Sequence, residues 1–282
     1  GEFMIELGKM QSLKVKRNTS IGLFLNTKDS TKDDKDVLLP RKEVPKGLKV
    51  GDDIEVFVYK DSQDRLISTI RKPKVLLGEV ALLQVVDITK LGAFLDWGLE
   101  KDLFLPFKEQ STKLVKGRRY LIGLYVDKSY RLCGTMKIKS FLRNDSPYKE
   151  DDWVKGTIYS INNELGAFVA VDDKYEGLIP KRELVGIFTE GDRVDVRVSN
   201  IKQDGKLDLS LRDKSYIEMD DDAQKILNRA VENRGILKLN DYSPPKEIRE
   251  QLNMSKSAFK RAIGRLLKED KIEFIENGIK IK

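Results

Sequence analysis

Apolar and polar positions alternate along the first three quarters of the chain, and the alternation follows one scheme that recurs three times. Each copy opens with a short apolar segment around a Gly-x-Phe step and ends with an apolar segment that runs into Pro and charged residues. The copies occupy residues 21–43, 91–109 and 165–183, and the Gly-x-Phe glycine stands at positions 22, 92 and 166, intervals of 70 and 74 residues. Alternation between turn residues predicts β-strands. A repeat of this length therefore predicts a barrel-sized β unit in three tandem copies.

Beyond residue 222 the apolar positions change to helical spacing, three and four residues apart. The first predicted helix ends near Gly235 and carries the apolar stripe Ala223, Ile226, Leu227, Ala230 and Val231. The second is short and has Ser243 as its N-cap, Pro244 as its first helical position, and Ile248 and Leu252 on its inner face. The third follows the cap Ser255 and carries the stripe Phe259, Ile263, Leu266 and Leu267.

Two short strands are predicted at the end of the sequence. The dipeptide Asn277-Gly278, a strong hairpin signal, separates the pair Ile272 and Phe274 from the pair Ile279 and Ile281. Three helices and a hairpin within about sixty residues are the layout of a winged helix, and the short second helix fits a helix-turn-helix core. The fold class expected is therefore mainly β, with three tandem antiparallel barrels followed by an α+β winged-helix domain.

These patterns divide the chain into four domains, at residues 1–73, 74–147, 148–216 and 217–282. Pro73 and Pro147 mark two of the joints because proline removes a ladder hydrogen bond from a strand. Units of this size are marginally stable alone, so we expect the barrels to pack on one another. The acidic residues of 218–222 are expected to form a linker and helix start rather than a metal site. Residues 1–3, before Met4, resemble a cloning remnant.

Composition excludes several classes of function. Cys133 is the single cysteine and the chain has no histidine, so a disulfide framework is absent and the chain suits a reducing cytoplasm. No apolar run reaches the length of a membrane span, and no partner membrane is expected. Metal ligation and nucleophilic chemistry would depend on carboxylates, Ser or Lys, and no pair of Asp or Glu has a context that suggests acid and base. We therefore expect no catalytic residue, no metal and no cofactor.

The distribution of charge points to a polyanionic partner. The net charge is +7, but residues 223–282 alone hold 14 cationic and 8 anionic residues, a net of +6, while residues 151–222 hold 10 and 17, a net of −7. On the third predicted helix the cations are Lys256, Lys260, Arg261, Arg265 and Lys268. Their spacing places them along one exposed side, with no acidic residue between them, where they can reach a phosphate backbone. A solvated helix face is the alternative.

The repeats offer a second kind of surface. In barrels that bind oligonucleotides, exposed aromatic rings stack on bases while nearby cations follow the backbone. Residues of the third repeat expected to form such a platform are Lys155, Tyr159, Phe168, Lys181 and Arg182. Secondary candidates in the middle repeat are Phe94, Trp97, Phe107 and Lys108. The alternative is that these aromatic residues fill the barrel core or serve in turns.

Five segments of the third repeat, at residues 154–158, 166–169, 176–179, 191–194 and 207–211, resemble the S1 RNA-binding domain. The resemblance implies a five-stranded barrel of the oligonucleotide-binding (OB) type, and it extends over 152–214, 76–139 and, more weakly, the first repeat. That family's RNA face typically carries two aromatic residues and a histidine. Phe24, Phe94 and Phe168 match the second aromatic. The first aromatic is replaced by Ile21, Leu91 or Leu165, and the histidine by Pro40, Pro106 or Pro180.

The order of three such domains and a winged helix, with the segment 253–264 opening the third helix, is similar to the bacterial conserved virulence factor B family. That resemblance implies a cytoplasmic RNA-binding protein that influences the expression of virulence genes, with no enzymatic activity.

The hypothesis we favour from the sequence is a non-enzymatic regulator that binds single-stranded RNA through the third barrel and the basic winged helix, near their junction. Two alternatives stay open. A winged helix can place its third helix in the major groove of DNA, which would make the protein a transcription regulator. Barrels that lack the expected aromatic residues and histidine could instead form a protein-interaction scaffold.

Overall fold

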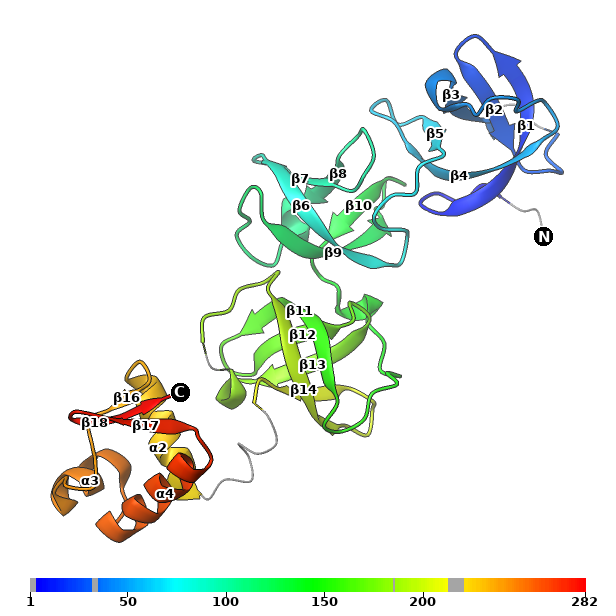
Figure 1. Ribbon diagram of the computed structural model, residues 1–282. Helices are drawn as coiled ribbons and strands as arrows, with labels where there is room; N and C mark the ends of the chain where they lie inside the picture. Colours follow the sequence, from blue (N-terminus) through cyan, green and yellow to red (C-terminus); the bar gives the residue numbers. More distant parts are fainter. Residues whose placement is uncertain (1–3, 32–34, 185, 213–220) are drawn as a thin grey trace. The chain divides into compact units, whose positions relative to one another are not determined.

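The computed structural model describes residues 4–31, 35–184, 186–212 and 221–282. The chain divides into two compact units, Gly1–Leu211 and Arg212–Lys282. The first unit contains three five-stranded sheets, and the second contains helices and a small sheet (Figure 1). The expected cloning remnant and most of the acidic segment 218–222 lie outside the described residues.

All three sheets of the first unit have the same order of strands. The first consists of β1 (Met10–Thr19), β2 (Gly22–Asn26), β3 (Val37–Pro40), β4 (Asp53–Lys60) and β5 (Leu66–Thr69). The second consists of β6 (Val80–Ile88), β7 (Gly92–Asp96), β8 (Leu103–Pro106), β9 (Arg119–Val126) and β10 (Leu132–Thr135). The third consists of β11 (Trp153–Asn162), β12 (Gly166–Val171), β13 (Tyr175–Pro180), β14 (Arg193–Ile201) and β15 (Leu207–Ser210). Parallel pairing of β3 with β5 and of β13 with β15 closes the first and third into barrels, while the second remains open between β8 and β10.

The repeated glycine of the Gly-x-Phe step is required by the close approach of two strands. At each of the three positions a Cβ atom would lie between 2.0 and 2.4 Å from a backbone oxygen of the adjacent strand, which no side chain tolerates. The glycines and their opposing oxygens are Gly22 with Leu39, Gly92 with Leu105, and Gly166 with Ile179. The repeat visible in the sequence is therefore a steric requirement of the barrel.

The glutamate that ends each repeated block also has a structural role. It stands in a short 3₁₀ turn after the proline and accepts a hydrogen bond from a hydroxyl at the end of the last strand of its sheet. The pairs are Thr69 with Glu43 at 2.9 Å, Thr135 with Glu109 at 2.7 Å, and Ser210 with Glu183 at 2.7 Å. This bond ties the turn after the third strand to the fifth strand, so each copy keeps its barrel shape.

The first and second sheets share an aromatic contact. Phe57 on β4 is fully buried in the hydrophobic core of the second sheet. The ring of Trp97, which follows β7, meets Phe57 edge-on at 5.7 Å and Tyr59 at 6.4 Å. The indole Nε1 of Trp97 donates a hydrogen bond to the backbone oxygen of Lys101 at 2.6 Å. These contacts join the two barrels through apolar surface rather than through the linker alone.

A second apolar cluster joins the middle and third sheets. Leu121 on β9 and Ile138 after β10 are buried against Tyr159 on β11 and Ala170 on β12, and Phe168 packs against the same cluster. The outer face of β11 and β12 therefore packs on the middle sheet.

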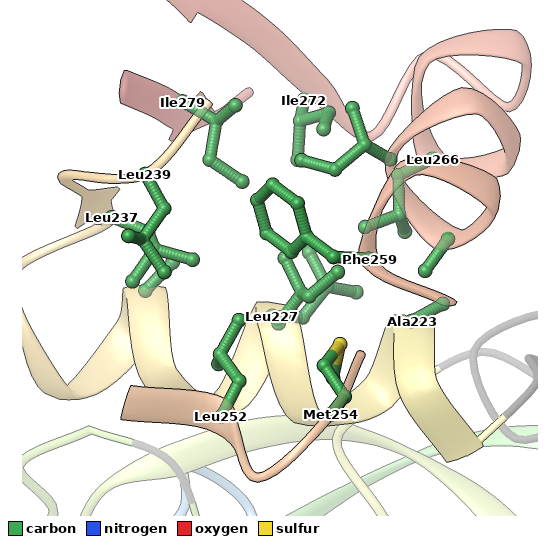
Figure 2. Close-up of a cluster of buried hydrophobic side chains, with 14 of the residues drawn as sticks. Ala223, Leu227, Leu237, Leu239, Leu252, Met254, Phe259, Leu266, Ile272 and Ile279 are labelled. Carbon is green, nitrogen blue, oxygen red and sulfur yellow. The ribbon is translucent and has the colours of Figure 1, made fainter. Parts of the chain in front are cut away.

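The second unit is a winged helix with its own core. Its elements are α2 (Asp221–Glu232), β16 (Ile236–Leu237), α3 (Pro245–Leu252), α4 (Lys256–Lys268), β17 (Ile272–Ile275) and β18 (Gly278–Ile281). Phe259 of α4 is fully buried, and Figure 2 shows its ring surrounded by side chains from the other helices and the strands. The sheet has the order β16-β18-β17. The predicted fold class, three OB-type barrels of mainly β structure followed by a winged helix, is confirmed.

Three local predictions need correction and one is confirmed. Pro244, rather than Ser243, is the N-cap of α3, because the Ser243 hydroxyl is occupied by the backbone N–H of Asn240. Val231 is 40% exposed and lies outside the core stripe of α2. The hairpin loop is residues 276–277, and Gly278 already pairs with Ile275. Ser255 caps α4 as predicted, its hydroxyl accepting from the N–H of Ala258 at 3.1 Å.

In the described part of the chain no helix is long and apolar enough to cross a membrane.

Candidate nucleic-acid interface

Helix α4 presents a cationic face opposite its buried stripe. Lys260, Arg261 and Lys268 are exposed, whereas Lys256 and Arg265 are half-buried. Within the described residues, Lys256, Lys260, Arg261 and Lys268 make no ion pair or side-chain hydrogen bond, so their charges are available to a ligand. The five cations of the prediction therefore do lie on one helix, and four of them are uncompensated.

Arg265 differs from the other four cations. Its Nε lies 3.0 Å from Oε1 of Glu269, the residue that follows α4, in an i,i+4 ion pair. The expectation that no acidic residue compensates this face is therefore wrong for Arg265, because the partner stands one residue beyond the helix rather than within it. Lys260, Arg261 and Lys268 are exposed and make no ion pair with a described residue, so they form the centre of the candidate nucleic-acid-binding surface on α4.

The platform expected in the third barrel is not available for stacking. Tyr159 is only 6% exposed and its ring lies 6.1 Å from that of Phe168, in the cluster that joins the middle and third sheets. Burial, followed by the charge of Glu176, raises the pKa of Tyr159 well above its ordinary value, so the hydroxyl stays protonated. A base cannot stack on a ring that another part of the protein already covers, which corrects the expectation for Tyr159.

The cations expected around that platform are exposed but separated. Lys155 lies beside the C-terminal end of β12, where its backbone oxygen accepts a hydrogen bond from the N–H of Asp172 at 2.9 Å. Lys181 and Arg182 lie at the opposite, N-terminal end of β12, where the N–H of Lys181 donates a hydrogen bond to the backbone oxygen of Leu165 at 2.9 Å. These three cations and the half-buried Phe168 are therefore not gathered into one site.

The buried hydroxyl of Tyr159 gives a stability prediction. Among the described residues it has no hydrogen-bond partner, and an unsatisfied buried hydroxyl is costly. The substitution Tyr159→Phe keeps the ring and removes this group, so we expect the first unit to gain about 1 kcal/mol in free energy of unfolding. The check is the urea midpoint of Tyr159→Phe against wild type and against Tyr148→Phe, whose hydroxyl bonds to Asp172. A lower midpoint for Tyr159→Phe than for wild type would contradict the prediction.

The middle barrel carries an aromatic pair on its outer face. Phe94 of β7 and Phe104 of β8 are direct cross-strand partners, and their ring centroids lie 5.4 Å apart. Both side chains are half-buried, as expected for outward residues with one face open. Phe104 was not among the residues predicted from sequence, although its position opposite Phe94 in an antiparallel hairpin was a signal that could have found it.

The other candidates of the middle repeat divide into two groups. Trp97 is 3% exposed and its ring contacts the first barrel, so the expectation that it stacks on a base is corrected in favour of inter-barrel packing. Phe107 is 70% exposed and Lys108 is exposed, both in the 3₁₀ turn after β8. Lys108 has no ion pair in the described part of the chain.

A pocket of about 720 Å³ opens beside the aromatic pair. Its walls include the rings of Phe94, Phe104 and Tyr125, and the cations Lys101 and Lys108 stand at its edge. Burial, followed by the charge of Glu109, raises the pKa of Tyr125 to about 12, so its phenol is neutral at physiological pH. An apolar, aromatic pocket with a few polar groups is the usual form of a small-ligand or nucleobase site.

Two further features bear on the chemistry of the site. Cys133 lines the pocket, and burial, followed by the charge of Asp127, raises its pKa to about 11, so it is not a reactive thiolate. In the described residues no group of three or more Asp, Glu or Cys side chains is arranged to hold a metal ion. The arrangement is suited to binding.

Tandem S1-type barrels followed by a winged helix with a free cationic helix define a class of nucleic-acid-binding proteins. Comparison with known families agrees: residues 7–71 and 77–137 match the S1 domain, residues 148–212 match the S1 RNA binding domain, and residues 224–281 match the CvfB-like winged helix domain. These are nucleic-acid-binding domain types and not catalytic families.

Relatives extend the match to nearly the whole chain. YitL of Bacillus subtilis (strain 168) is 31% identical over 96% of this chain and 92% of its own length. Conserved virulence factor B of Staphylococcus aureus (strain N315) is 28% identical over 82% of this chain and 79% of its own length. A crystal structure of a multidomain protein with nucleic acid binding domains from Streptococcus pneumoniae TIGR4 is 26% identical, covers 98% of both chains and has a TM-score of 0.51. The chain belongs to the conserved virulence factor B family.

Proposed function

We propose that this protein is a non-enzymatic, cytoplasmic regulator that binds single-stranded RNA and acts on gene expression after transcription, including that of virulence genes. The observation that carries the proposal is the face of α4, where Lys260, Arg261 and Lys268 are exposed and unpaired in the described part of the chain. Uncompensated cations on one helix face attract a phosphate backbone. The name of the Staphylococcus aureus relative supports the link to virulence.

The pocket of the middle barrel favours a single strand over a duplex. Rings such as Phe94 and Phe104 can stack only on bases that are unstacked and splayed out, and RNA loops and single strands present such bases. The first turn of α4 carries Lys256 and Ser257 and no Asn, Gln or Arg, so it offers mainly phosphate contacts. We therefore place the proposed binding surfaces on α4 and on the middle barrel, and no longer on the third barrel.

The test is fluorescence anisotropy of the full chain with a labelled single-stranded RNA, competed with unlabelled RNA or duplex DNA of the same sequence. We expect saturable binding at low salt, loss of binding as salt rises, and stronger competition by RNA. Stronger competition by duplex DNA would favour the transcription-regulator alternative. Absence of saturable binding to either nucleic acid would favour the protein-interaction scaffold, an alternative that the buried face of the third barrel also supports.

Gly264 provides an internal test of the α4 surface. It lies in the middle of α4 on the exposed side, and a Cβ at this position would contact no atom within 4 Å. Because glycine lowers helix stability by about 1 kcal/mol relative to alanine, Gly264→Ala should raise the free energy of unfolding of the winged helix. If a strand passes closely over this face, the same methyl group should weaken RNA binding severalfold.

For Gly264→Ala we expect a higher midpoint in thermal unfolding and a lower RNA affinity in anisotropy. Gln251→Ala, a neutral change on α3 outside the α4 face, serves as the control. A more stable Gly264→Ala variant with unchanged RNA affinity would mean that this part of α4 does not contact the strand.

A further inference from the structure

The pocket on the middle barrel is built by two barrels. Phe94 and Phe104 come from the second sheet and Leu91 from the turn before β7, while Tyr59 and Lys60 at the end of β4 come from the first sheet. Ser62 and Asp64, in the turn between β4 and β5, also line it. One side of what would otherwise be an open sheet face is therefore closed by the first barrel.

Polar and apolar contacts hold this closing turn in place. Nζ of Lys101 donates to the backbone oxygens of Asp61 at 2.9 Å and of Lys60 at 3.3 Å. Trp97 packs behind the pocket against Phe57. Because these groups are already bonded within the protein, the pocket exists before a ligand arrives, and binding does not require the turn to be ordered.

The walls of the pocket suit a nucleobase. Its volume of about 720 Å³ lies within the range of small-molecule sites. The half-buried rings of Phe94 and Phe104 offer a stacking surface, and the exposed Lys108 stands where a phosphate attached to the base can be neutralised. A strand can therefore place one base in the pocket while its backbone remains outside.

Asp102 supplies the pocket with a carboxylate that has no partner in the described part of the chain. It stands two residues before Phe104, directly before β8, and both side chains line the same pocket. Desolvation by the surrounding protein, followed by the charge of Asp96, raises the pKa of Asp102 above its usual range, although the side chain is exposed. By contrast, Asp127 at the same pocket is occupied by the N–H groups of Ser129 and Arg131.

An ionised carboxylate only accepts hydrogen bonds, through two oxygens side by side. Among the nucleobases, guanine presents two adjacent N–H donors, at N1 and N2, on its pairing edge. Uracil presents one N–H between two carbonyl oxygens, which a carboxylate repels. The carboxylate of Asp102 therefore discriminates between bases that the aromatic rings alone would accept equally.

We propose that the pocket between the first and second barrels binds a single unstacked guanine of an RNA strand. The guanine ring stacks on Phe94 and Phe104, and its N1–H and N2–H groups donate hydrogen bonds to the carboxylate of Asp102. This inference rests on the proposed function, since it names the base that an RNA-binding protein would select. Asp102 is then the residue that determines specificity.

The experiment compares two labelled heptamers, seven uridines and the same strand with guanosine at the central position, by anisotropy with the full chain at one salt concentration. Wild type should bind the guanosine strand about 10-fold more tightly, the usual size of discrimination by a paired base contact. Asp102→Asn should abolish this preference while it leaves the affinity for the uridine strand nearly unchanged. Asp64→Asn, a carboxylate change at the rim of the same pocket, should keep the preference.

The outcomes separate the two proposals. If neither heptamer binds at low salt, the proposed function fails. If both bind equally, or if Asp102→Asn retains the preference, or if Asp64→Asn alone removes it, the assignment of Asp102 is overturned while RNA binding stands. Phe104→Leu should weaken both heptamers, because it removes stacking. Because the Asp102 carboxylate is exposed, we expect Asp102→Asn and wild type to have the same thermal unfolding midpoint, which checks that the variant is folded.

Discussion

Reversing three charges on α4, as Lys260→Glu, Arg261→Glu and Lys268→Glu together, should lower the affinity for single-stranded RNA by roughly 100-fold at low salt. All three side chains are exposed and unpaired in the described part of the chain, so the wild-type charges are available to phosphates. Each phosphate contact on a single strand contributes about −0.7 to the slope of the logarithm of the binding constant against the logarithm of the salt concentration. Loss of three contacts should therefore make this slope shallower by about 2. Anisotropy titrations at several salt concentrations measure both quantities.

A control with the same change in net charge distinguishes a local contact from the general field of the protein. Lys46, Lys49 and Lys72 are exposed, belong to the first barrel or the segment after it, and line neither proposed surface. Reversing them to Glu should reduce the affinity much less than the α4 substitutions do. Equal losses for the two triple variants would show that α4 makes no direct contact with RNA.

Trp97→Ala should destabilise the first unit by about 3–5 kcal/mol, the cost of removing a large buried aromatic side chain. Trp97 is almost fully buried, contacts Phe57 and Tyr59 of the first barrel, and donates its indole N–H within the second. The cavity would therefore lie where the two barrels meet, and thermal unfolding should show a lower midpoint for the first unit. Because Trp97 also lines the pocket, the preference for the guanosine heptamer should decline as well.

The second tryptophan is the matched control for this prediction. Trp153 at the start of β11 is 53% exposed, so Trp153→Ala should change the free energy of unfolding by about 0.5 kcal/mol or less. Each variant leaves one tryptophan, which lets the emission of a buried and an exposed indole be recorded separately. An unfolding midpoint for Trp97→Ala as high as that for Trp153→Ala would mean that the barrels do not depend on this contact.

The fold was largely predictable because its signals are local. The Gly-x-Phe glycine, the proline that ends the third strand and the glutamate after it recur in the sequence, since each copy must solve the same steric and hydrogen-bonding problem. The cap Ser255 and the apolar stripe of α4 are likewise read from neighbours three and four residues apart. Boundaries were less accurate: at Ser243 an alternative hydrogen bond within the preceding turn displaced the predicted cap.

The candidate site was predicted in part. The cations of α4 follow from helical spacing, which a sequence shows directly, but the ion pair of Arg265 depends on a residue beyond the helix end. In the barrels, alternation showed that Phe94, Phe168 and Tyr159 could face outward. It could not show that the outer face of the third barrel packs on the middle one, because that contact joins residues far apart in the chain.

The sequence by itself determined the three barrels, the winged helix and the basic character of α4, because these depend on periodicity, turn residues and charge within short segments. Only the tertiary structure decided which aromatic residues remain open to a ligand. Tyr159 and Trp97 are covered where one barrel packs on another, while Phe94 and Phe104 stay open beside Asp102 in a pocket that the first barrel completes. The physical reason is that burial is shared between barrels: each covers part of its neighbour's outer face, and the face left uncovered is set by their packing.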